Sequence, residues 1–467
     1  MDLRIFRTGM FVATAFVFVT QAARTEEVAP AIAPRVDAAV SAVLARTGVP
    51  SASIALVQGG KIVYVHAYGW AQLSPQRAAT PSMRYAIGSV TKEFVATGIL
   101  MLQEHGELSI ADPVGKWFPD LGPAARVNLR ALLSHTSGIL DYWPQDYDFP
   151  DALRPIKPDD ILTRWAKRPL DFEPGTAWQY SNTGYTVAGL IVERVARQSL
   201  FEVLRSRIFA PLGMLSVWDF DASPMPSGDA VGYTHYALGT PRVAAKAGAG
   251  WAFAAGQLAM TASDLARWDV ALIHMQLLNA ASYRDLTTEV QLTSGVGSGY
   301  ALGLQVSLES GRRVLMHGGE LDGFTAHNRV YPDDEIAIVV LTNEDATGAS
   351  EAIAGKISEL MFAQPSRADG INPSEAQRLF LQLQQGRIEV ARLTPNGRSY
   401  FTPQVLDDYR SSLAPLGEPS RFELTRSYHR GGLIRRAYEA TFADKKIGVV
   451  VLYDTNGKIE QYIVSAK

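Results

Sequence analysis

The chain contains no cysteine among its 467 residues. This absence excludes disulfide bonds, a cysteine nucleophile, a cysteine-based zinc site and a lipidated N-terminal cysteine. The fold must therefore rest on the burial of apolar side chains. An excess of one charge is also lacking, because 44 basic and 47 acidic residues give a formal net charge of −3. Without a basic excess, nucleic acid is not an expected partner.

Long apolar runs are missing except at the N-terminus. Two arginines precede an apolar run from Met10, and small residues follow at Thr20 and Ala22. This order is typical of a secretory signal peptide and predicts a leader at residues 1–22. The alternative is an uncleaved anchor, although the run is short for a membrane span. We expect a periplasmic or secreted bacterial protein, associated with a membrane only if the leader stays uncleaved.

Sequence motifs for metals and cofactors are missing as well. The eight histidines show no H-x-x-x-H or H-E-x-x-H spacing, and the chain has neither a P-loop nor a G-x-G-x-x-G motif. We therefore expect no cofactor and no metal. No serine lies in a G-x-S-x-G elbow, which removes the usual sign of one large class of serine hydrolases.

Strand patterns occur at both ends of residues 34–362, with mostly helical sequence between them. Near the start, a helix is expected at 34–46, followed by strands at 51–58 and 61–69 around a Gly59-Gly60 turn. Near the end we expect four strands and a closing helix, at residues 300–308, 312–318, 324–332, 335–343 and 350–362. This order predicts one antiparallel sheet built from both ends, flanked by helices, plus a helical lobe. An active site between the lobes is typical.

The C-terminal part of the chain has a different texture. Residues 363–374 are rich in turn formers and predict a linker. Residues 375–467 follow with two helix patterns and four strand patterns, which predict a small α+β accessory domain without a catalytic cluster. It could restrict the crevice, bind a partner or mediate dimerisation, and the sequence leaves these alternatives and the oligomeric state open.

Ser89 and Lys92 stand three residues apart in AIGSVTKEFVATGIL at 86–100, at the start of an apolar helix pattern. This spacing puts both side chains on one helix face. They could be a helix cap followed by a solvated lysine, or a nucleophile beside its base. The ordinary lysine pKa is about 10.4, so a neutral Lys92 requires a dry, electropositive site.

A polar stretch, LLSHTSG at 132–138, brings His135 and Ser137 within two residues of each other. A Ser–His catalytic pair is conceivable here. The short spacing favours a structural loop instead.

Two further motifs could contribute to a site. Tyr180 and Asn182 in Y-S-N point the same way on an extended chain, so they could exchange a proton and bind an amide. A helix cap at Asn182 is an equal alternative, because a helix pattern begins at Thr183. The H-G-G motif at 317–319 ends a strand, where glycines let a ligand approach the backbone. A plain strand end and turn is again an equal alternative.

S-x-x-K, Y-S-N and H-G-G in this order resemble the serine β-lactamase and penicillin-binding protein superfamily, and in particular its class C-like serine hydrolases. Flanking stretches match that family too, at residues 132–139, 172–193, 258–268 and 317–324. The resemblance covers about residues 34–362. It implies a two-lobe β-lactamase-like fold, α+β in character, that acts through a covalent acyl-enzyme.

The resemblance also implies roles for individual residues. Ser89 would be the nucleophile, Lys92 its general base or a modulator of one, and Tyr180 a proton relay. The division of the base role between Lys92 and Tyr180 stays open. The backbone N–H groups of Ser89 and Glu320 would form the oxyanion hole. The substrate-binding residues would be Asn182, His317, Gly318 and Gly319.

One departure from the family pattern bears on the substrate. Class C β-lactamases carry a lysine where this chain has His317, and a histidine is mostly neutral near pH 7. This favours a serine hydrolase for esters, amides or D-amino-acid peptides. The alternatives are a β-lactamase or D-Ala-D-Ala carboxypeptidase, and a non-catalytic binding or sensor protein that keeps the fold. The intact set of Ser89, Lys92 and Tyr180 argues against the last. A small molecule or peptide is the expected partner.

Overall fold

The computed structural model describes the chain in segments, which are residues 32–145, 149–237, 239–309, 311–345, 347–362, 375–430, 433–454 and 457–466. The expected leader at 1–22 and the expected linker at 363–374 lie outside these residues. Within the described segments, none of the helices has both the length and the apolar character needed to cross a membrane.

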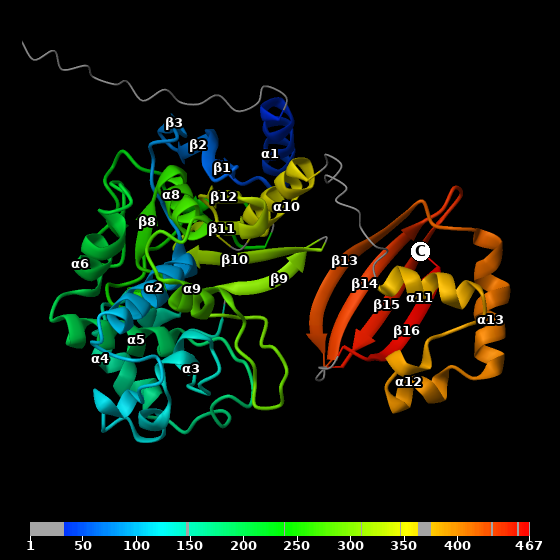
Figure 1. Cartoon of the computed structure of the whole chain (residues 1–467). Helices are drawn as coiled ribbons and strands as arrows, with labels where there is room; N and C mark the ends of the chain where they lie inside the picture. Colours follow the sequence, from blue (N-terminus) through cyan, green and yellow to red (C-terminus); the bar gives the residue numbers. More distant parts are fainter. Residues whose placement is uncertain are drawn as a thin grey trace, which may run out of the picture.

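A seven-stranded antiparallel sheet forms the centre of the larger part of the molecule (Figure 1). Its order is β3-β2-β1-β12-β11-β10-β9. β1 pairs with β12, so strands from the two ends of this region lie side by side, which confirms the expected sheet. The strands are β1 (Ser51–Gln58), β2 (Lys61–Leu73), β3 (Gln76–Ala78), β9 (Gln305–Glu309), β10 (Arg312–Leu321), β11 (Phe324–Tyr331) and β12 (Ile336–Thr342).

Glycines decide where two strands begin and end. Gly59 and Gly60 have φ values of 59° and 67° and make the predicted tight turn between β1 and β2. The strand expected at 300–308 begins only at Gln305, so the prediction was wrong for residues 300–304. Gly303 turns the chain there with a φ of 79°, and a Cβ on it would lie 2.6 Å from the Lys92 carbonyl oxygen. The loop before β9 is therefore pressed against the start of the Lys92 helix.

Helices cover both faces of the sheet. On β12, Ile338 and Val340 belong to the core shared with α1 and α10, whereas Val339 and Leu341 belong to the larger core. This two-sided burial explains the unbroken apolar run of this strand. The helices that contact the sheet are α1 (Ala33–Thr47), α10 (Ala349–Met361) and α8 (Ala262–Ile273).

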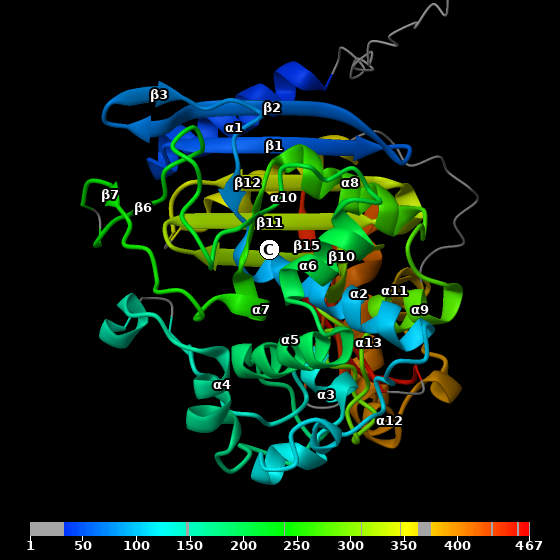
Figure 2. The ribbon, with the colours of Figure 1, turned by 90° about the vertical axis from the view of Figure 1, so that its left-hand side faces the viewer.

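A helical lobe lies below the sheet in Figure 2 and shares the larger core. Its central helix α2 (Thr91–Glu104) is buried at every residue from Thr91 to Leu100, so this part is enclosed on all sides. The other helices of the lobe are α3 (Leu129–Leu133), α4 (Pro158–Ile161), α5 (Asn182–Ala196), α6 (Leu200–Leu204), α7 (Phe253–Gly256) and α9 (Ala280–Thr287).

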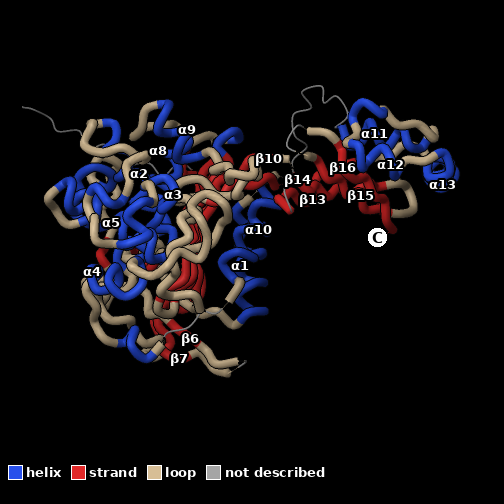
Figure 3. Tube along the Cα trace, turned by 90° about the horizontal axis from the view of Figure 1, so that it is seen from below, coloured by secondary structure: helices blue, strands red, loops and turns tan. Residues whose placement is uncertain are grey.

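The C-terminal residues form a four-stranded antiparallel sheet with helices and a core of their own (Figure 3). Phe380 and Leu383 of α11 pack there with Val449 of β15. β13, at the edge of this sheet, lies beside β9, at the edge of the larger sheet. The elements are α11 (Glu375–Gln384), α12 (Pro395–Tyr400), α13 (Pro403–Leu413), β13 (Arg421–Arg430), β14 (Leu433–Thr441), β15 (Lys446–Tyr453) and β16 (Ile459–Ala466).

Candidate active site

Ser89 and Lys92 meet at the start of α2. Ser89 lies in a short 3₁₀ turn, Gly88–Val90, and α2 begins at Thr91. Because Val90 occupies the N-cap position of α2, the interpretation of Ser89 as the helix cap is wrong. The Lys92 Nζ instead donates a hydrogen bond to the Ser89 Oγ over 2.9 Å. The pair has the geometry of a nucleophile beside its base.

The Lys92 side chain is fully buried. Its Nζ also donates to the Asn182 Oδ1 over 2.9 Å and to the Ala255 carbonyl oxygen over 2.6 Å. Burial lowers the pKa of Lys92 to about 7, against the opposing effect of the Asp141 carboxylate. A substantial fraction of Lys92 is therefore neutral near pH 7, as a proton acceptor must be.

Tyr180 and Asn182 reach Ser89 and Lys92 from the start of α5. Ser181 is the N-cap of α5, and its Oγ accepts a hydrogen bond from the Gly184 N–H over 3.2 Å. The alternative of a cap at Asn182 was therefore wrong, and the Asn182 side chain binds Lys92 instead. The Tyr180 phenol shares a hydrogen bond with Ser89, and burial raises its pKa, so it is a neutral proton donor near pH 7.

Two further residues support this group, and the sequence argument missed their part in it. Asp141 accepts hydrogen bonds from the Asn182 backbone N–H over 2.9 Å and from the Asn182 Nδ2 over 3.3 Å. His135 accepts one from the Ser181 N–H at its Nδ1 over 3.1 Å, and its ring lies 4.2 Å from the Tyr180 ring. The sequence feature that could have indicated their role is the polar run in LLSHTSGILD. The structure buries this run, which forms the expected loop.

The H-G-G strand approaches Ser89 through its backbone. A Cβ on Gly319 would lie 1.9 Å from the Ile87 carbonyl oxygen and 3.1 Å from the Ser89 nitrogen. A Cβ on Gly88 would lie 2.6 Å from the Glu320 nitrogen. Only glycine permits this contact between β10 and the turn that carries Ser89. It places the backbone nitrogens of Ser89 and Glu320 close together, the arrangement that an oxyanion hole requires.

His317 lies elsewhere than the sequence argument placed it. Its side chain is 2% exposed, and its Nε2 shares a hydrogen bond with the Tyr300 hydroxyl over 2.8 Å. Burial lowers the pKa of His317 to about 3, so the ring is neutral. Neither His317, Gly318 nor Gly319 is among the described residues that line the cavity above Ser89. A buried neutral imidazole supplies no cation for a substrate carboxylate.

A cavity of about 950 Å³ opens above Ser89, Tyr180 and Asn182. Aromatic side chains form part of its lining, from Tyr142, Trp143 and Trp251. Another part comes from the ends of β10 and β12 and from a segment between α6 and α7 in the chain, with Glu320, Asp322, Asp345, His235 and Tyr236. The described residues of the lining include no lysine or arginine, so the cavity favours a cationic group over an anionic one.

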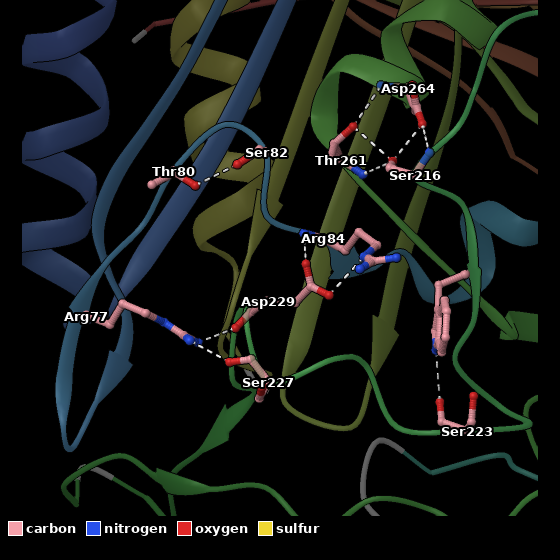
Figure 4. A network of polar contacts seen from close by, with 11 residues as sticks. Arg77, Thr80, Ser82, Arg84, Ser216, Ser223, Ser227, Asp229, Thr261 and Asp264 are labelled. Atoms are coloured by element: carbon pink, nitrogen blue, oxygen red, sulfur yellow. Dashed lines mark hydrogen bonds and ion pairs between the residues drawn. The ribbon is translucent and has the colours of Figure 1, made fainter.

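The segment that precedes His235 is held to the sheet by polar contacts that are exposed or partly buried (Figure 4). The Arg77 guanidinium donates to the carbonyl oxygens of Ser227 and Asp229, each over 2.5 Å. The Asp229 carboxylate accepts from the Arg84 backbone N–H and side chain. The chain then continues into a small hairpin, β6 (Tyr233–Thr234) and β7 (Arg242–Val243). These anchors fix one edge of the cavity lining.

No cluster of three or more histidine and acidic side chains suited to a metal ion occurs in the part of the chain that the structure describes. What the site offers is a serine nucleophile, a buried amine with a lowered pKa, a phenol and two convergent N–H groups.

Comparison with known proteins places the chain among enzymes of this kind. Residues 36–358 match the family model described as Beta-lactamase. Penicillin-binding protein 4* of Bacillus subtilis is 29% identical over 338 residues, which are 67% of this chain and 72% of the relative. The D-aminopeptidase of Gluconobacter oxydans is 28% identical over 399 residues, which are 82% of this chain and 73% of the relative.

Solved structures show the same fold. A D-stereospecific amidohydrolase from Streptomyces sp. superimposes with a TM-score of 0.61 and 27% sequence identity. The match covers 70% of this chain and 99% of that one. A TM-score of 0.61 indicates that the two proteins share their overall architecture.

Proposed function

The chain belongs to the beta-lactamase family and is a serine hydrolase, and we propose that it cleaves amides and peptides of D-amino acids whose amino group is free. The observation that carries this proposal is the cavity lining, whose described residues include Asp141, Glu320, Asp322 and Asp345 but no lysine or arginine. A substrate with a free ammonium group is attracted by such a lining, and a substrate with a carboxylate near the scissile bond is repelled.

In the first step of the proposed mechanism, the Ser89 Oγ attacks the substrate carbonyl carbon and gives its proton to neutral Lys92. Lys92 suits this role because it touches Ser89 and has a pKa of about 7. The negative charge that develops on the carbonyl oxygen meets the backbone N–H groups of Ser89 and Glu320. Each such donor typically contributes about 2.7–4 kcal/mol to the transition state.

In the second step, the amine leaves and the acyl-enzyme forms on Ser89. The leaving nitrogen needs a proton, which the neutral Tyr180 phenol beside Ser89 donates and then regains from Lys92. Water then attacks the acyl carbonyl carbon and gives a proton to the same pair. The bond to the Ser89 Oγ breaks, and this proton returns to Ser89 as the free acid leaves. This assigns the base role to Lys92 and the relay to Tyr180.

The stereochemistry of the proposal comes from the relatives. The D-aminopeptidase and the D-stereospecific amidohydrolase bear names that specify D-amino acids. The position of His317 supports the proposed substrate class in another way. Its buried ring cannot replace the lysine that class C β-lactamases use, so a β-lactam is disfavoured as the substrate. The aromatic part of the cavity lining favours a large apolar side chain on the substrate.

A comparison of substrates tests the proposal. The purified protein is assayed with D- and L-phenylalanine p-nitroanilide, N-acetyl-D-phenylalanine p-nitroanilide and a chromogenic cephalosporin. We expect the free D-amine to be the best substrate and acetylation to lower kcat/KM by at least about tenfold, since it removes a charge-assisted contact. Preference for the cephalosporin or for the acetylated amide would overturn the proposed substrate class.

A further inference from the structure

We propose that His235, held by Glu344, accepts a hydrogen bond from the substrate ammonium group and makes its binding pH-dependent. The inference rests on the proposed function, since it assigns a residue to the amine that this function requires. His235 lies in the cavity lining directly after β6. It is the histidine that the described lining contains, whereas His317 lies beneath the surface.

The pairing with Glu344 orients the imidazole ring. The His235 Nδ1 lies 2.8 Å from the Glu344 Oε1. The side chain of His235 is 21% exposed and that of Glu344 is 2% exposed. A carboxylate partner fixes the proton of a neutral imidazole on the nitrogen that it contacts. The other nitrogen, Nε2, then carries a lone pair that can accept a hydrogen bond.

Glu344 is held in place from the other side. It follows β12, and its backbone bridges Tyr233, the residue two before His235. Its Oε2 is buried and has no hydrogen-bond partner among the described residues. Burial raises the pKa of Glu344, with the contact to His235 opposing this shift. A buried carboxylate oxygen of this kind is costly, so a cation nearby is favourable.

The charges around His235 are predominantly negative. Two basic residues lie on this part of the chain. Arg242 on β7 is the backbone partner of Thr234, and the Lys246 Nζ donates hydrogen bonds to the carbonyl oxygens of Asp221 and Ala247. The acidic groups at the ends of the neighbouring strands are Glu320, Asp322, Glu344 and Asp345. A substrate ammonium group is therefore attracted to this corner by charge and oriented there by the His235 Nε2.

Protonation of His235 reverses this effect. An imidazolium ring has no lone pair to offer, and its positive charge repels an ammonium group. Binding of a cationic substrate should therefore weaken as the pH falls, and binding of its acetylated form should not follow the same change.

The test measures binding apart from turnover. In the Ser89→Ala background, Kd values for D-phenylalaninamide and N-acetyl-D-phenylalaninamide are measured by calorimetry from about pH 5.5 to 8.5. His235→Gln, Glu344→Gln and the exposed control His105→Gln are compared, with melting temperatures to check folding. Glutamine cannot titrate, so it separates the charge of residue 235 from its position.

We expect His235→Gln to weaken binding of the free amine by about tenfold at pH 8 and to abolish the weakening at low pH. Glu344→Gln should weaken it less and move the pH dependence, and His105→Gln should change neither ligand. An unchanged pH dependence in His235→Gln, or equal effects on both ligands, would overturn the inference. Binding that depends on His235 without cleavage of any D-amide by the unmodified protein would overturn only the proposed function. Cleavage without dependence on His235 would overturn only the inference.

Discussion

At the scale of single residues, the site depends on a lysine that is kept out of water. Lys92 is fully buried, and its Nζ makes hydrogen bonds to Ser89, Asn182 and Ala255. Each unit by which its pKa falls corresponds to about 1.4 kcal/mol of lost preference for the charged form. The protein therefore gives up stability at this position to hold an amine that is partly neutral near pH 7.

Replacing Ser89 by alanine should abolish hydrolysis. Loss of a serine nucleophile can lower kcat on the order of a millionfold. The measurement is turnover of a p-nitrophenyl ester, together with the mass added by an activated serine probe. Ser137→Ala, which changes a buried serine whose Oγ accepts from the Ile139 N–H, is the control. Labelling of Ser137 in place of Ser89 would refute the assignment.

Replacing Asp141 by asparagine should move the acid limb of the pH–rate profile. Lys92 must be neutral to act, so kcat/KM should fall as the pH falls through about 7. Asp141 raises the pKa of Lys92, and its removal should shift this limb to lower pH by about half a unit to one unit. The exposed Asp120→Asn is the control. A limb that stays in place would show that another group controls it.

The individual motifs could be read from the sequence, but their surroundings could not. Ser89, Lys92, Tyr180 and Asn182 come together as the order of motifs predicts. Asp141 was missed because nothing local marks a carboxylate whose partner lies 41 residues away. The burial of His317 was missed for the same reason, since it depends on where Tyr300 lies.

At the scale of the elements, α2 carries a second buried ionisable group beside Lys92. The Glu93 Oε2 accepts from the Trp268 Nε1 over 2.6 Å, and Asn328 links Glu93 to Asp269. Burial raises the pKa of Glu93 to about 8. Burial raises that of Asp269 as well, and the neighbouring carboxylate adds to this effect.

Replacing Glu93 by glutamine should flatten the decline of stability that runs from about pH 4.5 to about pH 8. A carboxyl with a raised pKa contributes stability that is complete below its ordinary pKa and is lost as the pH rises through about 8. The slope for one group is at most about 1.4 kcal/mol per pH unit. Urea unfolding from pH 5 to 9 compares this variant with the exposed control Glu351→Gln. Identical slopes of unfolding free energy against pH in the unmodified protein and in both variants would contradict the prediction.

Element boundaries followed the sequence where a glycine or an apolar pattern marked them. β1 spans the predicted residues 51–58 because its alternate residues pack into two cores. The strand expected at 300–308 was too long because Tyr300 and Leu304 are apolar but belong to a turn against α2. Composition cannot distinguish a buried turn from a strand, since both need apolar residues.

At the scale of the whole molecule, the catalytic cavity and the C-terminal sheet are separate. The described residues that line the cavity all lie before residue 346, and the C-terminal core contains only residues after 375. The leader at 1–22, the linker at 363–374 and the cellular location stay predictions. No sequence pattern announced that β13 would lie beside β9, because this contact depends on how two separate sheets meet.

A chain that ends after Phe362 should keep its hydrolytic activity. Its two cores use no residue beyond this point, and units of this size fold independently. We expect kcat/KM on a p-nitrophenyl ester within about threefold of the full chain. The full chain carrying a protease site at the linker provides the control, before and after cleavage. Loss of activity in the soluble, folded truncation would show that the C-terminal part contributes to the site.

The contact between β9 and β13 has a consequence for the behaviour of the protein in solution. Each strand forms one border of its sheet, where backbone groups are open to pairing with a foreign chain. By lying beside one another, the two borders shield each other from such pairing. By covering β9, the C-terminal part opposes self-association. Its removal would leave an active enzyme that precipitates at lower concentration.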